Sequence, residues 1–258
     1  MTLLVLAMAS CGNKQTGSQD AADEFTVDSL KFHNENEKGI VDLDVDFPLP
    51  TGTLLSDSIR QHITNVLGGN SYQGDLNDSQ AMIDFYGKQT MAAFDDNEEG
   101  GLQWSENTSF KLAEVTPHYV TYEISTYEFT GGAHGIGAYV LCTFNRESGR
   151  TFGYDLMKDT DSDAFGQLMK AGMKEYMRFD SSEEPTDEEL AQQLMLSDDA
   201  TIDHLPLPGN MPGLTKDGVQ FNYTPYEIAP YVAGTPTFVI SYEKIRPFLT
   251  EEGLKWIE

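Results

Sequence analysis

Cysteine is scarce in this chain, which has two cysteines among 258 residues. Disulfides therefore do not organise the fold, and one internal cysteine beside five scattered histidines makes no zinc signature. Cys142 lies in the apolar run AYVLCTF, which favours a buried, inert thiol over a nucleophile, because no motif places a base beside it. We predict no metal site, no cofactor and no catalytic residue.

Basic side chains are also scarce, because 16 Lys and Arg face 42 Asp and Glu, for a formal net charge of -26. Such a charge repels phosphate backbones and anionic lipid surfaces, which excludes nucleic acid as a natural partner. Two interpretations of the charge stay open. It keeps the protein soluble outside the cytoplasm, or it steers a cationic partner towards the surface.

Long apolar runs are missing too, since no stretch approaches the roughly 18 apolar residues of a membrane helix. A short apolar run, Leu3 to Met8, precedes Ala9, Ser10 and Cys11, and the chain then turns polar. This pattern is typical of a bacterial lipoprotein signal, in which Cys11 would carry a diacylglycerol and anchor the protein without spanning the bilayer. No Lys or Arg precedes Cys11, as a leader normally has. A mis-set start or a trimmed leader explains that departure, and a frayed terminus with a chance cysteine is the alternative.

These features predict an exported bacterial lipoprotein of the cell envelope, facing the periplasm or exposed at the surface. Residues 1–10 would be the remnant of the signal peptide. Residues 11–24, rich in Gly, Ser, Gln, Asp and Ala, would be a flexible tether. Folding is expected to begin near Phe25.

The first half of the folded part carries strand and helix signals. Between Ile40 and Phe47, apolar residues alternate with Asp42, Asp44 and Asp46, the period-2 pattern of a half-buried strand. We interpret the aspartates as a solvated outer face, because no turn folds them around a calcium ion. Apolar spacing and turn residues then predict helices over 54–67 and 79–94, strands over 102–115, 119–129 and 136–145, and a hairpin turn over 147–150 that leads back into Phe152 and Tyr154.

The second half opens on three aspartates, Asp159, Asp161 and Asp163, at the first ligand spacings of an EF-hand loop. Ala164 and Lys170 occupy the positions that need a glycine and a glutamate, so we predict an acidic turn that caps a helix. The expected elements are helices over 164–178 and 186–195, the second starting at a capping box, strands from 214, over 219–223 and over 237–242, and a closing helix.

We therefore expect an α+β protein of two abutting modules, each an antiparallel sheet with helices packed on it. The N-terminal module would span 25–155 and the C-terminal module 156–258.

The first motif with chemical potential is TGGAHG, residues 130–135. Adjacent glycines at Gly131 and Gly132 allow a bulge or a close backbone approach, and amides exposed there could bind an anion or a carbonyl group. His134 could act as a base or a ligand, although no carboxylate or cysteine stands at a diagnostic spacing. A bulge with a hydrogen-bonded histidine is the alternative.

The second motif is TPYEIAPYVAG, residues 224–234, where two prolines and a glycine shape a rigid corner. Tyr226 and Tyr231 either pack in this corner or present aromatic faces. Aromatic rings beside Glu227 could hold a sugar. The candidate binding residues are thus Gly131, Gly132, His134, Tyr226, Glu227 and Tyr231.

Taken together, the motifs carry a family resemblance. TGGAHG, FGYDLM, DGVQFNYTPYEIAPYVAG and VISYEKIRPFL, in this order, resemble the extracellular region of RsiV-type anti-sigma factors. Residues 25–155 are similar to the module ahead of the catalytic domain in PdaC-type peptidoglycan deacetylases. The resemblance implies binding of lysozyme, a basic enzyme. It implies no residue-level roles, and we do not expect signalling or deacetylation to carry over, because residues 1–258 contain neither a sigma-binding segment nor a deacetylase domain.

The favoured hypothesis is a non-catalytic envelope lipoprotein that binds a lysozyme-like protein or a cell-wall glycan and contacts the membrane through its lipid anchor. One alternative is an envelope hydrolase or deacetylase acting on peptidoglycan, with His134 and carboxylates that folding brings to it. The other is a structural lipoprotein.

Overall fold

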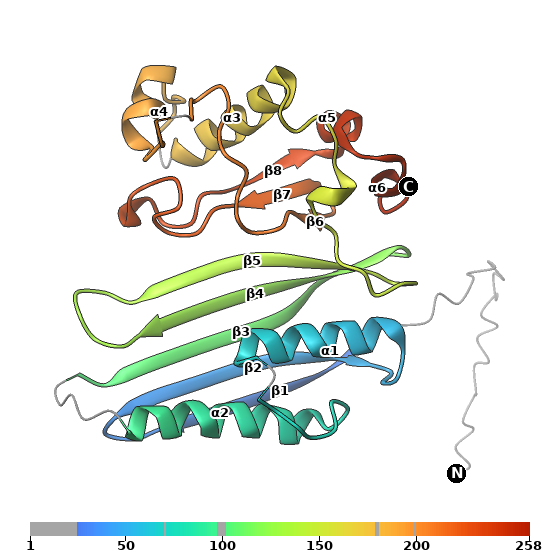
Figure 1. Cartoon of the computed structure of the whole chain (residues 1–258), viewed down its shortest axis with the longest axis vertical. Coiled ribbons are helices and arrows are strands. Elements are labelled where there is room, and N and C mark those ends of the chain that lie inside the picture. The colour runs from blue at the N-terminus through green and yellow to red at the C-terminus, as the bar shows by residue number, and fades with distance from the viewer. Residues whose placement is uncertain (1–24, 70, 97–101, 179–180, 199) are drawn as a thin grey trace, which may run out of the picture.

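Two sheets with helices packed on them make up the fold (Figure 1). The structure is a computed structural model that describes residues 25–69, 71–96, 102–178, 181–198 and 200–258. Cys11 and the predicted tether lie outside the described residues. In the described part of the chain, no helix is long and apolar enough to cross a membrane.

The fold class is mixed, as expected, with one five-stranded and one three-stranded sheet. The strands are β1 Thr26–Glu35, β2 Gly39–Leu49, β3 Trp104–Val115, β4 Tyr119–Phe129, β5 Ile136–Asn145, β6 Gly213–Thr215, β7 Gly218–Asn222 and β8 Thr237–Ser241. The helices are α1 Leu54–Leu67, α2 Ser79–Asp95, α3 Asp163–Met177, α4 Asp187–Gln193, α5 Tyr242–Ile245 and α6 Glu251–Leu254, with single 3-10 turns at Tyr154–Leu156, Tyr231–Ala233 and Arg246–Phe248.

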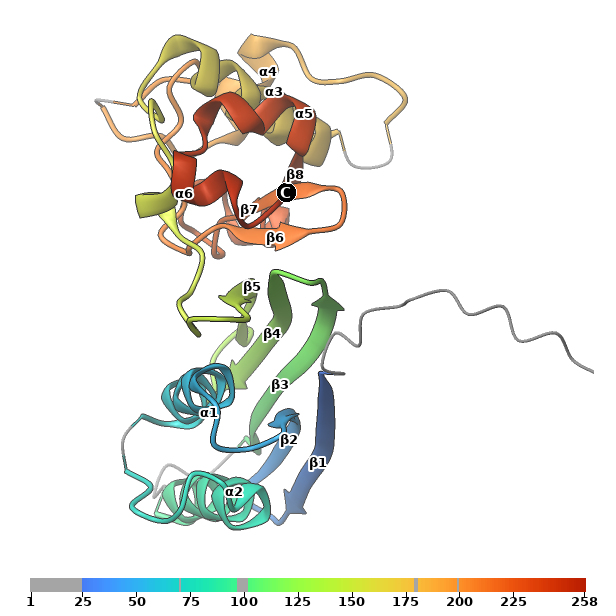
Figure 2. The ribbon, with the colours of Figure 1, turned by 90° about the vertical axis from the view of Figure 1, so that its right-hand side faces the viewer.

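Both helices of the N-terminal module, α1 and α2, pack on one face of the five-stranded sheet (Figure 2). The alternation predicted for the second strand is confirmed, because Val41, Leu43, Val45 and Phe47 are all buried. They meet Ile59 and other apolar residues of the two helices in one hydrophobic cluster. The predicted bounds of both helices hold to within one residue.

The prediction of purely antiparallel sheets is wrong for the N-terminal module, in which β2 and β3 pair in parallel. The reason is the connection between them. Two helices, α1 and α2, separate these strands in the sequence. This crossover brings the chain back to the end of the sheet at which β2 begins, so that β3 runs in the same direction as β2. The other strand pairs are antiparallel.

The aspartates of β2 are not the freely solvated face that we predicted. Asp44 forms ion pairs with Lys31 and Lys111, and the distance from Lys31 Nζ to the carboxylate is 2.9 Å. Asp46 is buried, with an exposed fraction of 7%, and accepts hydrogen bonds from Lys111 Nζ at 2.8 Å and from Ser29 Oγ at 2.7 Å. The neighbouring strand β1, for which we predicted no strand, supplies Lys31 and Ser29, whose side chains contact the aspartates on this face.

We expect these contacts to make stability depend on acid pH. Burial opposes the charged form of Asp46, but the hydrogen bonds from Lys111, Ser29 and the Leu112 amide outweigh it, so the pKa of this carboxyl lies below its ordinary value of 3.8. Stability from a depressed carboxyl pKa is present above the unfolded-state value and is lost as the pH falls through the folded-state value. Asp46→Asn should lower the free energy of unfolding at neutral pH by about 1 to 2 kcal/mol.

The measurement is urea unfolding at a series of pH values from neutral down to below the ordinary carboxyl pKa. In Asp46→Asn the loss of stability on acidification should be shallower than in the wild type. The exposed Asp161→Asn serves as the control with the same change of charge. Parallel acid profiles for wild type and Asp46→Asn would contradict the assignment.

The C-terminal module packs α3 against β8, close enough that a Cβ at Gly172 would overlap the ring of Phe238. Its buried cluster includes Phe152, which lies on the N-terminal side of the predicted boundary at residue 155. Helix α3 begins at the N-cap Ser162, whose hydroxyl accepts the amide of Phe165. The capping box that we predicted at Thr186 and Glu189 is confirmed at the start of α4.

Two expectations about the ends of this module need correction. Beyond the turn at 147–150, only a single bridge joins Phe144 to Thr151, so no returning strand forms at Phe152 and Tyr154. The predicted closing helix is broken into α5, a 3-10 turn and α6. Pro247 lies between α5 and α6, and proline cannot continue a helical hydrogen-bond ladder.

The modules meet where β6 lies against β4 and β5. The amide of Leu214 donates to Thr143 Oγ1 at 2.8 Å, and Thr121 Oγ1 donates to the Leu214 carbonyl at 2.8 Å. Because the Thr121 hydroxyl proton is used in that hydrogen bond, the Thr143 hydroxyl is the donor to Thr121 Oγ1, at 2.8 Å. This closed ring of three buried hydrogen bonds satisfies the backbone of Leu214 with side chains of the other module.

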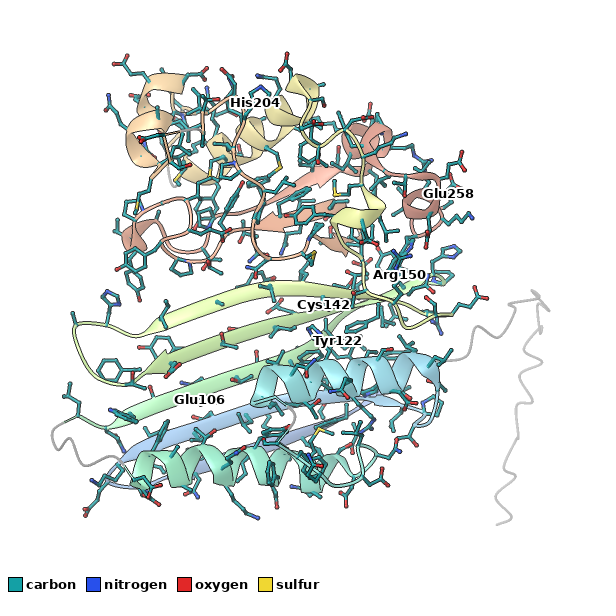
Figure 3. All side chains as sticks on the ribbon, viewed as in Figure 1. Glu106, Tyr122, Cys142, Arg150, His204 and Glu258 are labelled. Atoms are coloured by element: carbon teal, nitrogen blue, oxygen red, sulfur yellow. The ribbon has the colours of Figure 1, made fainter. Side chains whose placement is uncertain are left out.

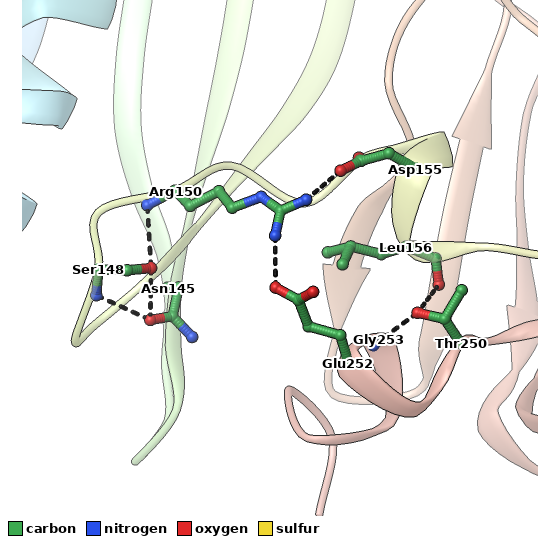
Figure 4. A network of polar contacts seen from close by, with 8 residues as sticks. All are labelled: Asn145, Ser148, Arg150, Asp155, Leu156, Thr250, Glu252 and Gly253. Carbon is green, nitrogen blue, oxygen red and sulfur yellow. Dashed lines mark hydrogen bonds and ion pairs between the residues drawn. The ribbon is translucent and has the colours of Figure 1, made fainter.

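Arg150 makes a second junction (Figure 4). Its guanidinium pairs with Glu252 of α6 and with Asp155, while its backbone follows the turn in which Asn145 Oδ1 accepts the Ser148 hydroxyl at 2.9 Å. Nearby, Thr250 Oγ1 donates to the Leu156 carbonyl at 3.1 Å. The charged pairs are exposed, so they add little to the free energy of unfolding and serve mainly to orient the two modules.

Candidate functional site

Three aromatic side chains from the two sequence motifs lie together at the junction of the modules. The rings of His134 and Tyr231 stack with centroids 3.9 Å apart and an interplanar angle of 18°. The Tyr226 ring lies 5.6 Å from the Tyr231 ring and 6.4 Å from the His134 ring. We call His134, Tyr226 and Tyr231 the aromatic platform. His134 comes from the β4–β5 hairpin, whereas the tyrosines come from the corner between β7 and β8.

Hydrogen bonds determine the tautomer of His134. Its Nδ1 lies 2.9 Å from the Gly135 carbonyl, which can only accept, so Nδ1 carries the proton. In the neutral imidazole, Nε2 then accepts the hydrogen bond of the Tyr226 hydroxyl at 3.3 Å. The Tyr231 hydroxyl donates to the same Gly135 carbonyl at 2.9 Å. The imidazole is thus held in place by the backbone and by one tyrosine from the other module.

Tyr226 is held in a conformation that non-glycine residues rarely adopt, with φ of 69°. Such a backbone costs about 1–3 kcal/mol and persists where its surroundings impose it. Glu227 imposes it here, because its carboxylate accepts the amide of Thr224 at 2.7 Å and the amide of Gly209 at 2.6 Å. Glu227 therefore braces the corner that presents Tyr226, and its contact with a ligand stays a prediction.

Gly131 and Gly132 form the tip of the hairpin that carries His134. Both have positive φ, 102° and 92°, and open space lies where a Cβ would stand. The positive φ angles favour glycine at both positions, but no neighbouring atom would clash with a larger side chain. Binding of an anion by their amides stays a prediction.

A groove of about 840 Å³ lies beside the platform, over the ends of β3, β4 and β5. We call it the junction groove, since both modules line it: Thr224 and Pro225 contribute from the C-terminal module, and Phe94 and Thr90 of α2 contribute from the N-terminal module. Trp104 and Tyr127 add aromatic rings, and the exposed fraction of Tyr127 is 41%. Its volume is in the range of small-molecule sites.

The platform and the groove adjoin. Pro225, which lines the groove, immediately precedes Tyr226 of the platform. Tyr127 also contacts Gly135, because a Cβ at Gly135 would stand 2.5 Å from the phenol ring. The Gly135 carbonyl in turn receives the Tyr231 hydroxyl. A ligand lying along this surface would meet aromatic rings from both modules in succession.

Two carboxyl groups face the groove, at Glu106 and Glu128, which lie directly opposite each other on β3 and β4 (Figure 3 labels Glu106). Burial and the nearby Glu128 carboxylate raise the pKa of Glu106, and a hydrogen bond with Thr90 opposes that shift. No motif in the sequence pointed to this pair. A signal was available, since Glu106 shares one face of β3 with Trp104, Thr108 and Phe110, where an apolar residue would be expected.

Cys142 lies farther along the same face of the sheet, in a smaller pocket of about 480 Å³ shared with Met211 of the C-terminal module. It is a free thiol, and burial raises its pKa to about 12. It is therefore protonated at neutral pH, in agreement with the predicted inert thiol. Over the ranges that the structure describes, no group of three or more His, Cys, Asp or Glu side chains is arranged to hold a metal ion.

Comparisons with known proteins match two separate parts of the chain. Residues 34–137 match the family model described as "Deacetylase PdaC", and residues 154–243 match the model described as "Protein of unknown function (DUF3298)". No curated protein matches the chain.

Two crystal structures share the fold. A DUF3298 family protein from Pseudomonas aeruginosa is similar with a TM-score of 0.63 and 19% identity, covering 90% of this chain and 97% of the other. A DUF3298 family member from Bacteroides fragilis gives a TM-score of 0.61 and 20% identity, covering 90% and 95%. At these identities the likeness shows the fold alone. By the two family models, the chain contains a PdaC-like N-terminal module followed by a DUF3298 domain.

Proposed function

We propose that this protein is a non-catalytic glycan-binding protein of the bacterial cell envelope. The observation that carries the proposal is the aromatic platform beside the junction groove. Sugar rings have apolar C–H faces that pack on aromatic rings, while their hydroxyls need polar partners nearby. The platform offers the exposed Tyr226 ring, and the groove offers Thr90, Thr126 and Gln89 among its polar lining.

An extended ligand suits this site better than a compact one. The platform and the groove adjoin and together span the junction, so neighbouring units of an oligosaccharide would occupy both. The peptidoglycan strand is the extended saccharide of the envelope, and the match of residues 34–137 to a model named for a deacetylase agrees with that class of ligand. Lipid attachment at Cys11 and residence in the envelope complete the proposal, as the sequence predicts.

Substitution of the platform tests the proposal. We expect Tyr231→Ala to weaken binding of a chitin tetrasaccharide about tenfold, or about 1.4 kcal/mol, because it removes the ring that stacks on His134. Trp104 lines the groove and Trp256 is the second tryptophan of the chain, so a Trp256→Phe background lets fluorescence of Trp104 alone report binding. Titration of that fluorescence gives the affinity.

The matched control is Tyr242→Ala, which removes a tyrosine of the C-terminal module whose hydroxyl donates to the Thr215 carbonyl at 2.6 Å and which lines neither the groove nor the platform. Tyr242→Ala should keep the wild-type affinity in folded protein, as checked by circular dichroism. Absence of binding to chitin and peptidoglycan fragments by the wild type would refute the proposed function. An equal loss of affinity in the two variants would show that the platform is not the binding site.

A lysozyme-like basic protein is the second candidate, favoured by the formal net charge of -26. Calorimetric titration with lysozyme and with a basic protein of matched charge distinguishes specific capture from general attraction. Binding that is specific to lysozyme and persists at physiological salt would support capture. Binding shared with the control and lost with salt would reduce the acidic surface to a role in solubility.

A further inference from the structure

We propose that the junction groove selects saccharides that bear free ammonium groups, and that Glu106 is the residue that determines this selectivity. The inference rests on the proposed function and names its ligand class more closely. An amino sugar whose nitrogen is not acetylated has the required chemistry: a ring that stacks on aromatic side chains and a cation fixed to that ring.

The charge of the groove is the first observation. Glu106 and Glu128 both line it, and none of the described residues that line it is Lys, Arg or His. The two glutamates are register partners on β3 and β4, which places their Cβ atoms about 5 Å apart. Like charges in that position repel each other and attract a cation that enters between them.

The environment of Glu106 is the second observation. Its side chain is partly buried on the floor of the groove, and it shares a hydrogen bond with the neutral hydroxyl of Thr90. Burial and Glu128 both raise the pKa of Glu106, so the ionised carboxylate is held at a cost. An ammonium group would lower that cost, since it supplies the missing opposite charge.

The aromatic lining is the third observation. Trp104 stands edge-to-face with Phe94 at a centroid distance of 5.6 Å, and both line the groove with the glutamates. Aromatic faces attract ammonium groups, more strongly where water is excluded. An N-acetyl group carries no charge, so it would gain packing but neither the ionic nor the cation–π contribution.

The test compares two ligands that differ in acetylation. Chitin tetrasaccharide and its fully deacetylated counterpart are titrated into the full chain at low and physiological salt. We expect the wild type to bind the amino form about tenfold more tightly, and Glu106→Gln to lose that preference while it keeps its affinity for the acetylated form. Glu106→Gln keeps the side-chain shape, and thermal unfolding confirms that it folds.

Glu243→Gln is the matched control, because Glu243 is exposed on α5 in the C-terminal module and the substitution changes the net charge equally. It should keep the wild-type preference. A pH series adds an independent readout. Because the pKa of Glu106 is raised, the preference for the amino form should begin to fall on acidification at a pH above the ordinary glutamate value of 4.5.

The outcomes separate the inference from the proposed function. Equal affinity for the two ligands would overturn the selectivity and leave glycan binding standing. A preference that Glu106→Gln and Glu243→Gln reduce equally would also overturn it, since the whole acidic surface would then be responsible. Binding of neither ligand would refute both proposals. Preference for the amino form that only Glu106→Gln removes would establish the assignment.

Discussion

Arg60→Ala is expected to destabilise the N-terminal module by about 3 to 5 kcal/mol. Arg60 belongs to α1 and is buried, with an exposed fraction of 1%. Its guanidinium donates to the Leu76 carbonyl at 2.8 Å and to the Pro48 carbonyl at 3.2 Å. It therefore ties α1 to the end of β2 and to the loop that leads into α2.

The size of the effect follows from what the substitution leaves behind. Ser79 Oγ also accepts from Arg60, at 2.9 Å, so two buried acceptors and one partly buried acceptor would lose their donor. Hydrogen bonds from charged groups are worth about 1.5–3 kcal/mol, and an unpaired buried acceptor costs about 1–3 kcal/mol. The guanidinium also lies 5.3 Å from the centre of the Phe47 ring, so packing and a cation–π contact are lost with it.

Urea unfolding measures this loss, with fluorescence of Trp104 as the probe in the Trp256→Phe background. Arg246→Ala is the control, because Arg246 is an exposed arginine of the other module, paired with Glu258 at 3.0 Å. It should change stability by less than about 1 kcal/mol. A comparable loss in the two variants would contradict the role given to Arg60.

Gly213→Leu is expected to destabilise the contact between the modules by about 1 to 3 kcal/mol, as overpacking does in well-packed interiors. A Cβ at Gly213 would stand 2.4 Å from Leu141 Cβ, an approach that the rigid start of a side chain cannot accommodate. β6 would have to withdraw from β5. The ring of hydrogen bonds among Leu214, Thr121 and Thr143 would then open.

Cys142 provides a direct readout of this separation. It lies in a pocket that Asn210 and Met211 of the C-terminal module help to line, so parting the modules should expose it. In a Cys11→Ser background we expect Gly213→Leu to raise the rate of thiol labelling at Cys142 about tenfold or more, consistent with a contact weakened by about 1.4 kcal/mol or more.

The same variant should also lose glycan binding, because the platform draws His134 from one module and its tyrosines from the other. Gly209→Ala is the control, since a Cβ there would approach Glu227 Oε1 no closer than 3.4 Å. Its labelling rate should match the wild type. Unchanged labelling in Gly213→Leu would mean that the modules do not depend on close contact at Gly213.

The local signals of the sequence were sufficient for most elements. Alternating apolar residues in β2 and helical spacing in α1 and α2 predicted their type and nearly their bounds. The capping box at Thr186 and Glu189 located the start of α4. Strand β1 escaped prediction, because an edge strand that is only partly buried has weak alternation.

The two candidate motifs could be identified in the sequence, but their proximity could not. His134 and Tyr226 are 92 positions apart, and no spacing rule joins a hairpin of one module to a corner of the next. Glu227 stood out as a possible sugar ligand, whereas the fold uses its carboxylate to hold the backbone of Thr224 and Gly209. Hydrogen-bond partners of this kind depend on which backbone groups the fold leaves unpaired.

The sequence by itself determined most of the element types, the acidic charge, the lack of a disulfide framework and the residues of the platform. These follow from local periodicity, turn chemistry and composition, which need no knowledge of distant contacts. Tertiary structure alone decided the parallel pairing of β2 with β3, the meeting of Glu106 with Glu128 and the groove that both modules line. Those features arise from long-range packing. Burial of apolar area brings strands and modules together, and residues far apart in the chain then share one surface.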